Sequence, residues 1–209
     1  MKLYYHEISS NARKACAVAK HLALDVDYVA VDLTKGEHKT PEFLAINPNG
    51  KLPALIDNGK VLWESNAIMC HLADKAGSDL WPKDERQIDI VRWFCWEQAH
   101  FTRHAGTLFF ENFIKPAMGR DDINAEAVRE ATEFLHRFAG VLDVHLEGRD
   151  YLVGNALTVA DFAVGVVVPL AATGKVPLDG YAEIGRWQAA LNELPAWREP
   201  FPEKVASAA

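Results

Sequence analysis

Two hydroxyl residues, Ser9 and Ser10, follow a strand-like run over residues 2–6 and precede a helical pattern established by residue 12. A hydroxyl at the start of a helix lies beside free backbone N–H groups and near the positive end of the helix dipole. Such a position can hold a thiolate or a carboxylate. The simpler alternative is that one of the two hydroxyls only caps the helix. The pair is therefore a candidate anion site.

A second candidate site is the Leu52-Pro53 dipeptide, which stands where a hairpin strand begins. Proline cannot donate a ladder hydrogen bond, so it belongs at an edge, a first position or a bulge. A cis bond here would turn the Leu52 backbone outward to pair with an extended ligand. An ordinary trans proline would only start the strand. The sequence leaves both alternatives open.

Charged and donor groups stand at two further junctions. Ser65, at the start of a predicted helix, would expose N–H groups to a carboxylate, while Glu64 could hold an ammonium beside it. Together they could bind the amino-acid end of a zwitterion. His38 and Lys39 could serve a second carboxylate. The alternative for Glu64 and Ser65 is a capped helix beside a solvated acid, and the alternative for His38 and Lys39 is a solvated surface turn.

The elements that must position these residues form a small α/β unit followed by helices. Turn-forming residues over 77–83 separate the two parts, so we predict domains at 1–76 and 84–209 with 77–83 as the linker. Thr158 and Asp161 have the spacing of a capping box, with Asp in place of the usual Glu. In the first domain, apolar spacing and an Asn-Gly turn signal predict strands at 2–6, 29–33, 52–56 and 60–63, and helices at 12–22 and 65–75.

The composition argues against several classes of function. The 209 residues include 22 Lys+Arg and 29 Asp+Glu, for a formal net charge of -7. An acidic chain repels phosphate backbones and anionic lipids, so we expect neither nucleic acid nor membrane as a partner. The first residues lack a signal-peptide pattern, and the three cysteines are too widely spaced for a metal site or a disulfide framework. We therefore expect a cytoplasmic protein with no metal.

Residues outside these junctions are expected to serve packing. Cys16 and Cys95 are each near small or apolar neighbours, which favours burial as small apolar side chains. Trp93 and Trp96 lie on a helical pattern and are also assigned to the core.

The junction residues recur along the chain in a fixed order. Taken in that order, they resemble the glutathione transferases, and most closely the serine-type theta and phi branch. The resemblance implies a thioredoxin-like first domain with the order βαβ-ββα and an all-α helical bundle as the second domain. The residues that carry it are Ser9, Asn11, His38, Lys39, Pro41, Glu42, Phe43, Leu44, Asn47, Pro48, Gly50, Lys51, Pro53, Ala54, Glu64, Ser65, Ala67, Ile68, Glu97, His100, Phe101, Phe110, Glu111, Lys115, Pro116, Thr158, Ala160 and Asp161.

By this resemblance, glutathione is the co-substrate and no cofactor is bound permanently. Its cysteine portion would pair with the backbone before a cis proline, its γ-glutamyl end would meet the Glu-Ser pair, and its glycine carboxylate would meet the cations. The implied binding residues are His38, Lys39, Lys51, Leu52, Pro53, Glu64 and Ser65.

Ser9 matches the family's catalytic serine, and Asn11 would assist it. A free thiol with a pKa of about 8.5 is mostly protonated at neutral pH, and a hydroxyl donor to the sulfur favours the thiolate. Ser10 is the rival donor. The implied electrophile site consists of Ile8, Ser10, Phe101, His104, Ala105 and Leu108, the last four sharing one helical face that plain core packing would equally explain.

The implied activity is conjugation of glutathione to small hydrophobic electrophiles by a homodimer with a role in detoxification. Alternatives on the same fold are a glutathione-dependent dehalogenase, isomerase or peroxidase, or a non-enzymatic interaction module. A thiol oxidoreductase fits poorly, because Ser9 and Ser10 stand where its cysteine would be needed and Cys16 lies inside the helix.

Overall fold

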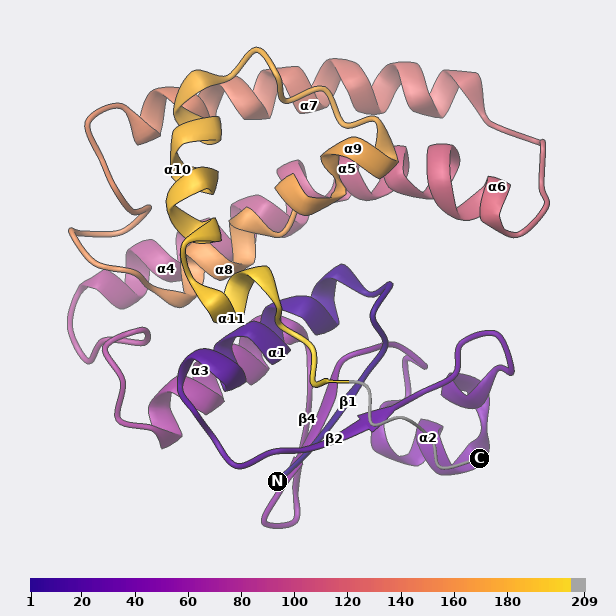
Figure 1. Cartoon of the computed structure of the whole chain (residues 1–209), viewed down its shortest axis with the longest axis vertical. Coiled ribbons are helices and arrows are strands. Elements are labelled where there is room, and N and C mark those ends of the chain that lie inside the picture. The colour runs from indigo at the N-terminus through magenta and orange to yellow at the C-terminus, as the bar shows by residue number, and fades with distance from the viewer. Residues whose placement is uncertain (204–209) are drawn as a thin grey trace. The chain divides into compact units, whose positions relative to one another are not determined.

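The computed structural model describes residues 1–203, which fall into two compact units (Figure 1). The first unit contains Met1–Ser78 and the described residues from Leu194 onward, and the second is Asp79–Glu193. The predicted second domain extends to residue 209, whereas the structure places residues 194–203 with the first unit. The cause is a set of contacts made by α1 (Ser10–His21) and β1 (Lys2–Tyr5). The Arg13 guanidinium donates to the Trp197 carbonyl oxygen, and Tyr5 stacks on Phe201.

The first unit is a four-stranded mixed sheet with the strand order β2-β1-β3-β4. β2 pairs with β1 in parallel, and the other two pairings are antiparallel. Helices α1 and α3 pack against each other beside the sheet. This arrangement confirms the thioredoxin-like βαβ-ββα prediction. The elements are β1 Lys2–Tyr5, α1 Ser10–His21, β2 Asp27–Ala30, the 3-10 turn Glu37–Lys39, α2 Pro41–Ile46, β3 Ala54–Asp57, β4 Lys60–Trp63, α3 Ser65–Lys75 and, from the end of the chain, α11 Pro195–Arg198.

Two turns show why the strands end where they do. Asn58 and Gly59 both have positive φ, at 49° and 80°, as the two-residue hairpin between β3 and β4 requires, which confirms the turn predicted from Asn-Gly. β2 ends at Ala30, earlier than the predicted strand over 29–33. Asp32 explains the difference, because its carboxylate accepts the N–H groups of Thr34 and Lys35 and turns the chain.

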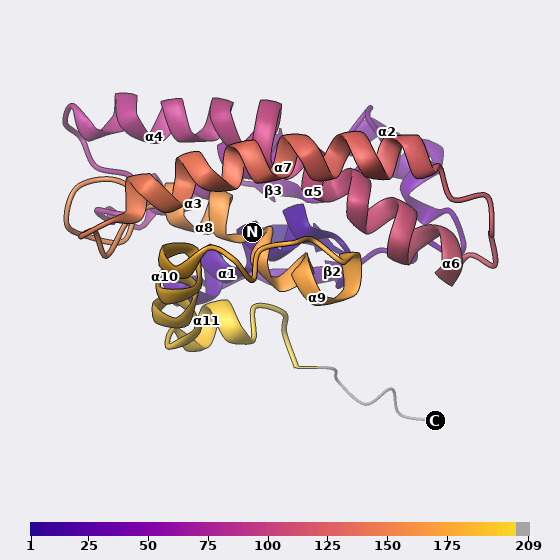
Figure 2. The same ribbon diagram turned by 90° about the horizontal axis from the view of Figure 1, so that it is seen from above.

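The second unit is entirely helical, as predicted. In α7 the buried positions recur every three or four residues, and Figure 2 shows this helix running alongside α5, with which it packs. All seven residues of α8 are buried, and Thr158 and Asp161 form the predicted capping box at its start. The α-helices are α4 Arg86–Trp96, α5 Thr102–Phe109, α6 Lys115–Ala117, α7 Ala125–Leu146, α8 Val159–Gly165, α9 Ala171–Gly174 and α10 Ala182–Asn192.

The cysteines differ in exposure. Cys16 is buried in α1, as expected, and burial raises the pKa of its thiol to about 12. The prediction for Cys95 is wrong, because this residue is exposed. The buried stripe of α4 passes through Ile90 and Trp93, and Cys95 lies about half a turn away from that stripe. Within residues 1–203, none of the helices combines the length and apolarity needed to cross a membrane.

Asp57, at the end of β3, is 6% exposed and connects the sheet to α3. Its carboxylate lies 2.9 Å from His71 Nε2 and accepts hydrogen bonds of 2.8 Å from Lys75 Nζ. Lys75, and then His71, lower the pKa of Asp57 below its usual value. The ionised carboxylate is therefore favoured by folding.

Replacing Asp57 by asparagine is expected to reduce the free energy of unfolding by about 2 kcal/mol near neutral pH. Because the folded-state pKa is depressed, this contribution is complete above the unfolded value of 3.8 and disappears as pH falls through the lower folded-state value. Urea unfolding near neutral pH and in acid measures both effects. The exposed Asp25→Asn serves as control, with an expected change below about 0.5 kcal/mol. If Asp57→Asn is destabilised by the same amount in acid as near neutral pH, the prediction is contradicted.

Candidate functional site

Ser9 is the N-cap of α1, at the junction with β1. Its Oγ accepts the Ala12 N–H at 3.2 Å and lies 3.4 Å from the carbonyl oxygen of Leu52. Because the cap uses the oxygen as an acceptor, the hydroxyl proton is left for donation. At 3.4 Å the bond to Leu52 is long, so a stronger acceptor can replace the carbonyl. The capping and donor roles, which the sequence presented as alternatives, are therefore compatible.

The peptide bond between Leu52 and Pro53 is cis, the first of the two alternatives considered from the sequence. Both residues are buried, and ladder pairing with β4 begins only at Ala54. Within the described part of the chain, no protein group accepts the Leu52 N–H. This backbone donor is therefore available to an extended ligand beside Ser9.

A loop over residues 47–51 lies against the short turn that carries His38. Asn47, which is 2% exposed, donates through Nδ2 to the Lys51 carbonyl oxygen at 2.7 Å. Gly50 has φ +58°, and a Cβ there would lie 3.0 Å from the His38 carbonyl oxygen. A side chain at Gly50 would thus push the two segments apart. Asn47 and Gly50 position this part of the site, a role that their place in an Asn-Pro-x-Gly run could have suggested.

His38 and the two lysines lie at this loop with different degrees of burial. The Nδ1 atom of His38 is buried and has no hydrogen-bond partner among residues 1–203. Lys39 and Lys51 are exposed. A buried polar atom without a partner is uncommon in folded proteins, and it suits a site whose partner is a ligand. A carboxylate is one acceptor that these three side chains could share.

Ser65 lies at the other end of the site and connects α3 to α1. It is 4% exposed, and its Oγ donates to Asn11 Oδ1 at 3.2 Å. The helix begins at Ser65, as predicted, and its N-cap is Glu64. Glu64 is exposed and has φ +72°, an unfavourable conformation for a residue with a side chain. Such conformations often occur at functional sites.

These contacts bring together three junctions that are far apart in the sequence. Ser9 meets Leu52, and Asn11, two residues further along α1, meets Ser65. The N-terminal ends of α1 and α3 therefore share one surface with the segment before β3, and both helix ends favour negative charge. The site combines a hydroxyl, a free backbone donor and two helix N-termini, which suits a thiolate and a carboxylate.

The residues predicted for the electrophile site have different environments. Ile8 and Ser10 belong to the first unit, where Ile8 is exposed and Ser10 is half-buried. Phe101, Ala105 and Leu108, in the second unit, are 1% exposed or less. Their burial is what core packing requires, so their role in an electrophile site stays a prediction.

His104 is partly exposed, and its ring stacks on Phe134 of α7 with centroids 4.9 Å apart. Burial lowers the pKa of this imidazole. The ring of His104 thus contacts α7, and its role in an electrophile site stays a prediction.

Comparison with known proteins identifies relatives over the whole chain. Residues 1–74 match the family "Glutathione S-transferase, N-terminal domain", and residues 103–195 match "Glutathione S-transferase, C-terminal domain". Glutathione S-transferase 3 of Zea mays is 33% identical over 100% of this chain and 99% of its own length.

Two solved structures agree with these matches. The apo form of glutathione S-transferase III has a TM-score of 0.83 and 32% identity, covering 95% of this chain and 94% of that chain. Glutathione S-transferase-I with bound lactoylglutathione has a TM-score of 0.85 and 27% identity, covering 95% and 97%. The chain is therefore a transferase that belongs to the glutathione S-transferase family.

Proposed function

We propose that this transferase joins the thiolate of glutathione to hydrophobic electrophiles, and that the Ser9 hydroxyl activates the thiol. The observation that carries the proposal is the Ser9 hydroxyl itself, which caps α1 through its oxygen and keeps its proton for donation beside Leu52. A hydrogen bond to sulfur and the nearby helix N-terminus both favour the thiolate over the thiol. A serine hydroxyl is therefore sufficient to activate the thiol, and the reactive sulfur is that of glutathione.

The binding mode we propose places the cysteine portion of glutathione along Leu52 and cis Pro53. The free Leu52 N–H supports this placement, because an extended peptide offers a carbonyl oxygen to it. The γ-glutamyl end would contact Glu64 and Ser65 at the start of α3. The glycine carboxylate would contact the cationic loop, whose members are His38, Lys39 and Lys51. The relative with bound lactoylglutathione supports a glutathione derivative as ligand.

A charge-neutral replacement at Glu64 tests the binding mode. Glu64→Gln is expected to weaken glutathione binding about tenfold, because the ammonium of the γ-glutamyl group loses its ionic partner. Isothermal titration calorimetry measures the dissociation constant, and kcat at saturating glutathione should change little. The control is Glu42→Gln on α2, an exposed acid in the same unit, with unchanged affinity expected. If the wild type and Glu64→Gln bind glutathione with equal affinity, the γ-glutamyl ammonium does not lie at Glu64. If the wild type does not bind glutathione, the alternative of a non-enzymatic interaction module is favoured.

We further propose that the protein is a homodimer, is cytoplasmic and acts in detoxification, as the resemblance to its family implies. The free thiols of Cys16, Cys70 and Cys95 are compatible with a reducing compartment. Sedimentation at micromolar concentration tests the dimer directly. A sedimentation coefficient that corresponds to a monomer, at the concentration used for kinetics, would contradict the proposed dimer.

A further inference from the structure

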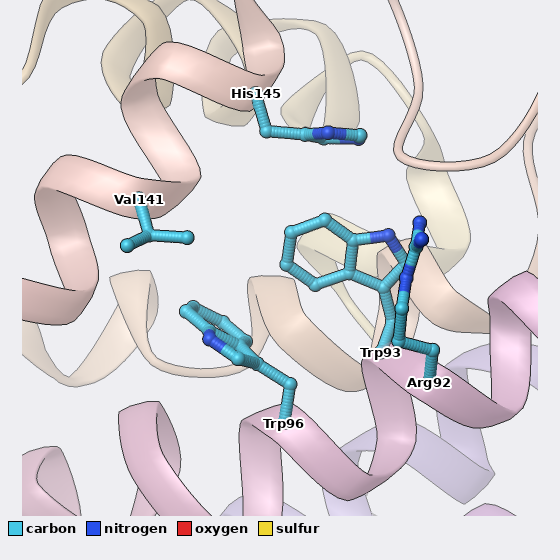
Figure 3. A pocket seen from close by; sticks show the side chains of 5 residues that line it. All are labelled: Arg92, Trp93, Trp96, Val141 and His145. Atoms are coloured by element: carbon cyan, nitrogen blue, oxygen red, sulfur yellow. The ribbon is translucent and has the colours of Figure 1, made fainter.

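Each of the two units contains a pocket whose wall residues take no part in the proposed conjugation. The pocket of the helical unit has a volume of about 270 Å³, and its walls are Arg92, Trp93, Trp96, Val141 and His145 (Figure 3). The pocket of the first unit is larger, at about 540 Å³, and its charged wall residues are all acidic. This volume is within the usual range for a small organic ligand. We call the pocket of the first unit the acidic pocket.

Two tyrosine rings form one corner of the acidic pocket. Tyr5 ends β1 and Tyr28 lies in β2, and their ring centroids are 6.0 Å apart with the ring planes at 86°. Burial raises the pKa of both hydroxyls, that of Tyr28 to about 12, so both side chains are uncharged at neutral pH. The face of a tyrosine ring attracts a cation. The corner therefore resembles two walls of an aromatic cage.

The segment that follows α11 forms another wall of the acidic pocket. Phe201 stacks on Tyr5 with ring centroids 5.7 Å apart, and Pro202 and Glu203 line the pocket. Two basic side chains of α1 donate hydrogen bonds to backbone carbonyl oxygens of α11 and of the residue after it. The wall is thus anchored to the first unit, and the pocket lies between this segment and β2.

β2 is an edge strand, and its outer edge offers backbone acceptors to the acidic pocket. The N–H groups of Asp27 and Val31 donate to carbonyl oxygens on the β1 side. In a parallel pair the residues between such donors direct their backbone groups away from the partner strand. Within residues 1–203, no second strand pairs with β2. The carbonyl oxygens of Tyr28 and Ala30, which both line the pocket, are therefore available to an N–H donor.

Carboxylates give the acidic pocket its charge. Glu7 and Glu203 are exposed wall residues, and the charge of Glu7 adds to burial in raising the pKa of Tyr5. Asp27 is a third acid in the wall, but its carboxylate lies 3.9 Å from Lys2 Nζ, which compensates part of its charge. The wall residues include no Lys or Arg. The pocket therefore favours a cation.

We propose that the acidic pocket binds an amphipathic organic cation, an arylalkylamine in its protonated form. The ammonium group lies at the corner of Tyr5 and Tyr28 and donates hydrogen bonds to the Glu7 carboxylate and to the edge carbonyl oxygens of β2. The aromatic ring of the ligand packs on the apolar wall residues Val26 and Pro202. Cation–π attraction and charge-assisted hydrogen bonds select the amine over a neutral compound of the same shape.

The test is a calorimetric titration of the whole protein with tryptamine at neutral pH, in the presence of excess S-hexylglutathione to occupy the candidate active site. We expect one site per chain, and affinity about tenfold weaker for tryptophol, in which a neutral hydroxyl replaces the ammonium. Glu7→Gln is expected to weaken tryptamine binding about fivefold and to leave tryptophol binding unchanged. The matched control is Asp25→Asn, which removes an exposed carboxylate outside the pocket walls and should bind tryptamine like the wild type.

Two positions on β2 provide further variants. Ala30→Trp fills the pocket from an exposed position, where a strand accepts an aromatic residue. It is expected to abolish tryptamine binding while the melting temperature stays within a few degrees of the wild type. Tyr28→Phe keeps the ring and should bind tryptamine like the wild type, whereas Tyr28→Leu should bind it about threefold more weakly.

Three results would overturn the proposal. The first is that tryptamine gives no heat of binding up to about 1 mM. The second is that tryptophol binds as tightly as tryptamine, because the charge then contributes nothing. The third is that Glu7→Gln and Ala30→Trp both bind tryptamine like the wild type, because the amine then occupies another part of the protein.

Discussion

Replacing Ser9 by alanine is expected to lower kcat/KM for glutathione conjugation about 100-fold, with little change in glutathione affinity. The loss of activity follows from the raised pKa of the glutathione thiol. Without the Ser9 donor, the pKa of bound glutathione returns toward about 8.5, and a rise of about two units reduces the thiolate fraction by up to 100-fold. Steady-state kinetics below pH 7 and the ultraviolet absorbance of the bound thiolate measure the two effects separately.

Ser10→Ala is the matched control, because Ser10 is the next residue and also carries a hydroxyl but does not cap the helix. It should retain most of the activity. Ser9→Ala also removes the cap, at a cost of about 1 kcal/mol in stability, so its melting curve must show that the protein is folded under assay conditions. Ser9→Thr, which keeps the hydroxyl, should recover part of the rate. Comparable losses in the two alanine variants, with unchanged glutathione affinity, would show that Ser9 is not the specific donor.

Local patterns predicted the fold well where a residue type has one favoured conformation. Asn58-Gly59 required positive φ at both positions and marked the hairpin. Thr158 and Asp161 marked the start of α8 through short-range hydrogen bonds. Such signals depend on neighbours in sequence and need no knowledge of tertiary contacts.

The contacts that assemble the candidate site could not be predicted in this way. The Ser9 to Leu52 and Asn11 to Ser65 hydrogen bonds join residues 43 and 54 positions apart. The first depends on the pairing of β1 with β3, and the second on the packing of α1 against α3. The sequence indicates which junctions carry polar residues, whereas tertiary packing determines the distances between these residues. Arg13 shows the same limit, because a cation in a helix suggests solvent exposure, whereas it lies 5.2 Å over the Trp197 ring.

Helix geometry changes on both sides of the predicted face of residues 101, 104, 105 and 108, whereas α5 itself is regular, and Phe101, Ala105 and Leu108 are all buried. The structure has a π-helical turn at Glu97–Phe101 and another at Phe110–Ile114, so α5 is an α-helical segment between two wider turns. π-turns depend on tertiary packing and leave no clear pattern in a single sequence.

Asp161 is the residue whose loss should destabilise the protein most. It is 0% exposed, and its carboxylate accepts four hydrogen bonds. The donors are Leu152 N–H at 2.9 Å, Thr158 N–H at 2.9 Å, Thr158 Oγ1 at 3.1 Å and Trp187 Nε1 at 3.1 Å. The capping box found in the sequence supplies two of them, and tertiary contacts add the other two. One side chain therefore holds the start of α8, the preceding loop and α10 in place.

Asp161→Ala is expected to reduce the free energy of unfolding by about 4 kcal/mol, because it leaves four buried donors without an acceptor. Asp161→Asn keeps the shape but turns an NH₂ group toward two of the donors, and the expected loss is about 3 kcal/mol. The control is Asp150→Asn, whose side chain is 84% exposed and which should change stability by less than about 0.5 kcal/mol. Urea unfolding monitored by circular dichroism provides the comparison. A loss no larger for Asp161→Asn than for Asp150→Asn would show that the four hydrogen bonds add little.

The pH dependence of the same variants gives a second, independent test. Burial raises the pKa of Asp161 to about 6, against a model-compound value of 3.8, while the four donors oppose the rise. Between these two values the folded state binds a proton that the unfolded state has released, so the contribution of Asp161 decreases as pH rises from 3.8 to about 6. The stability difference between the wild type and Asp161→Asn should therefore be larger in mild acid than at neutral pH. A difference that grows with increasing pH would mean that the donors outweigh desolvation and that the carboxylate is ionised throughout this range.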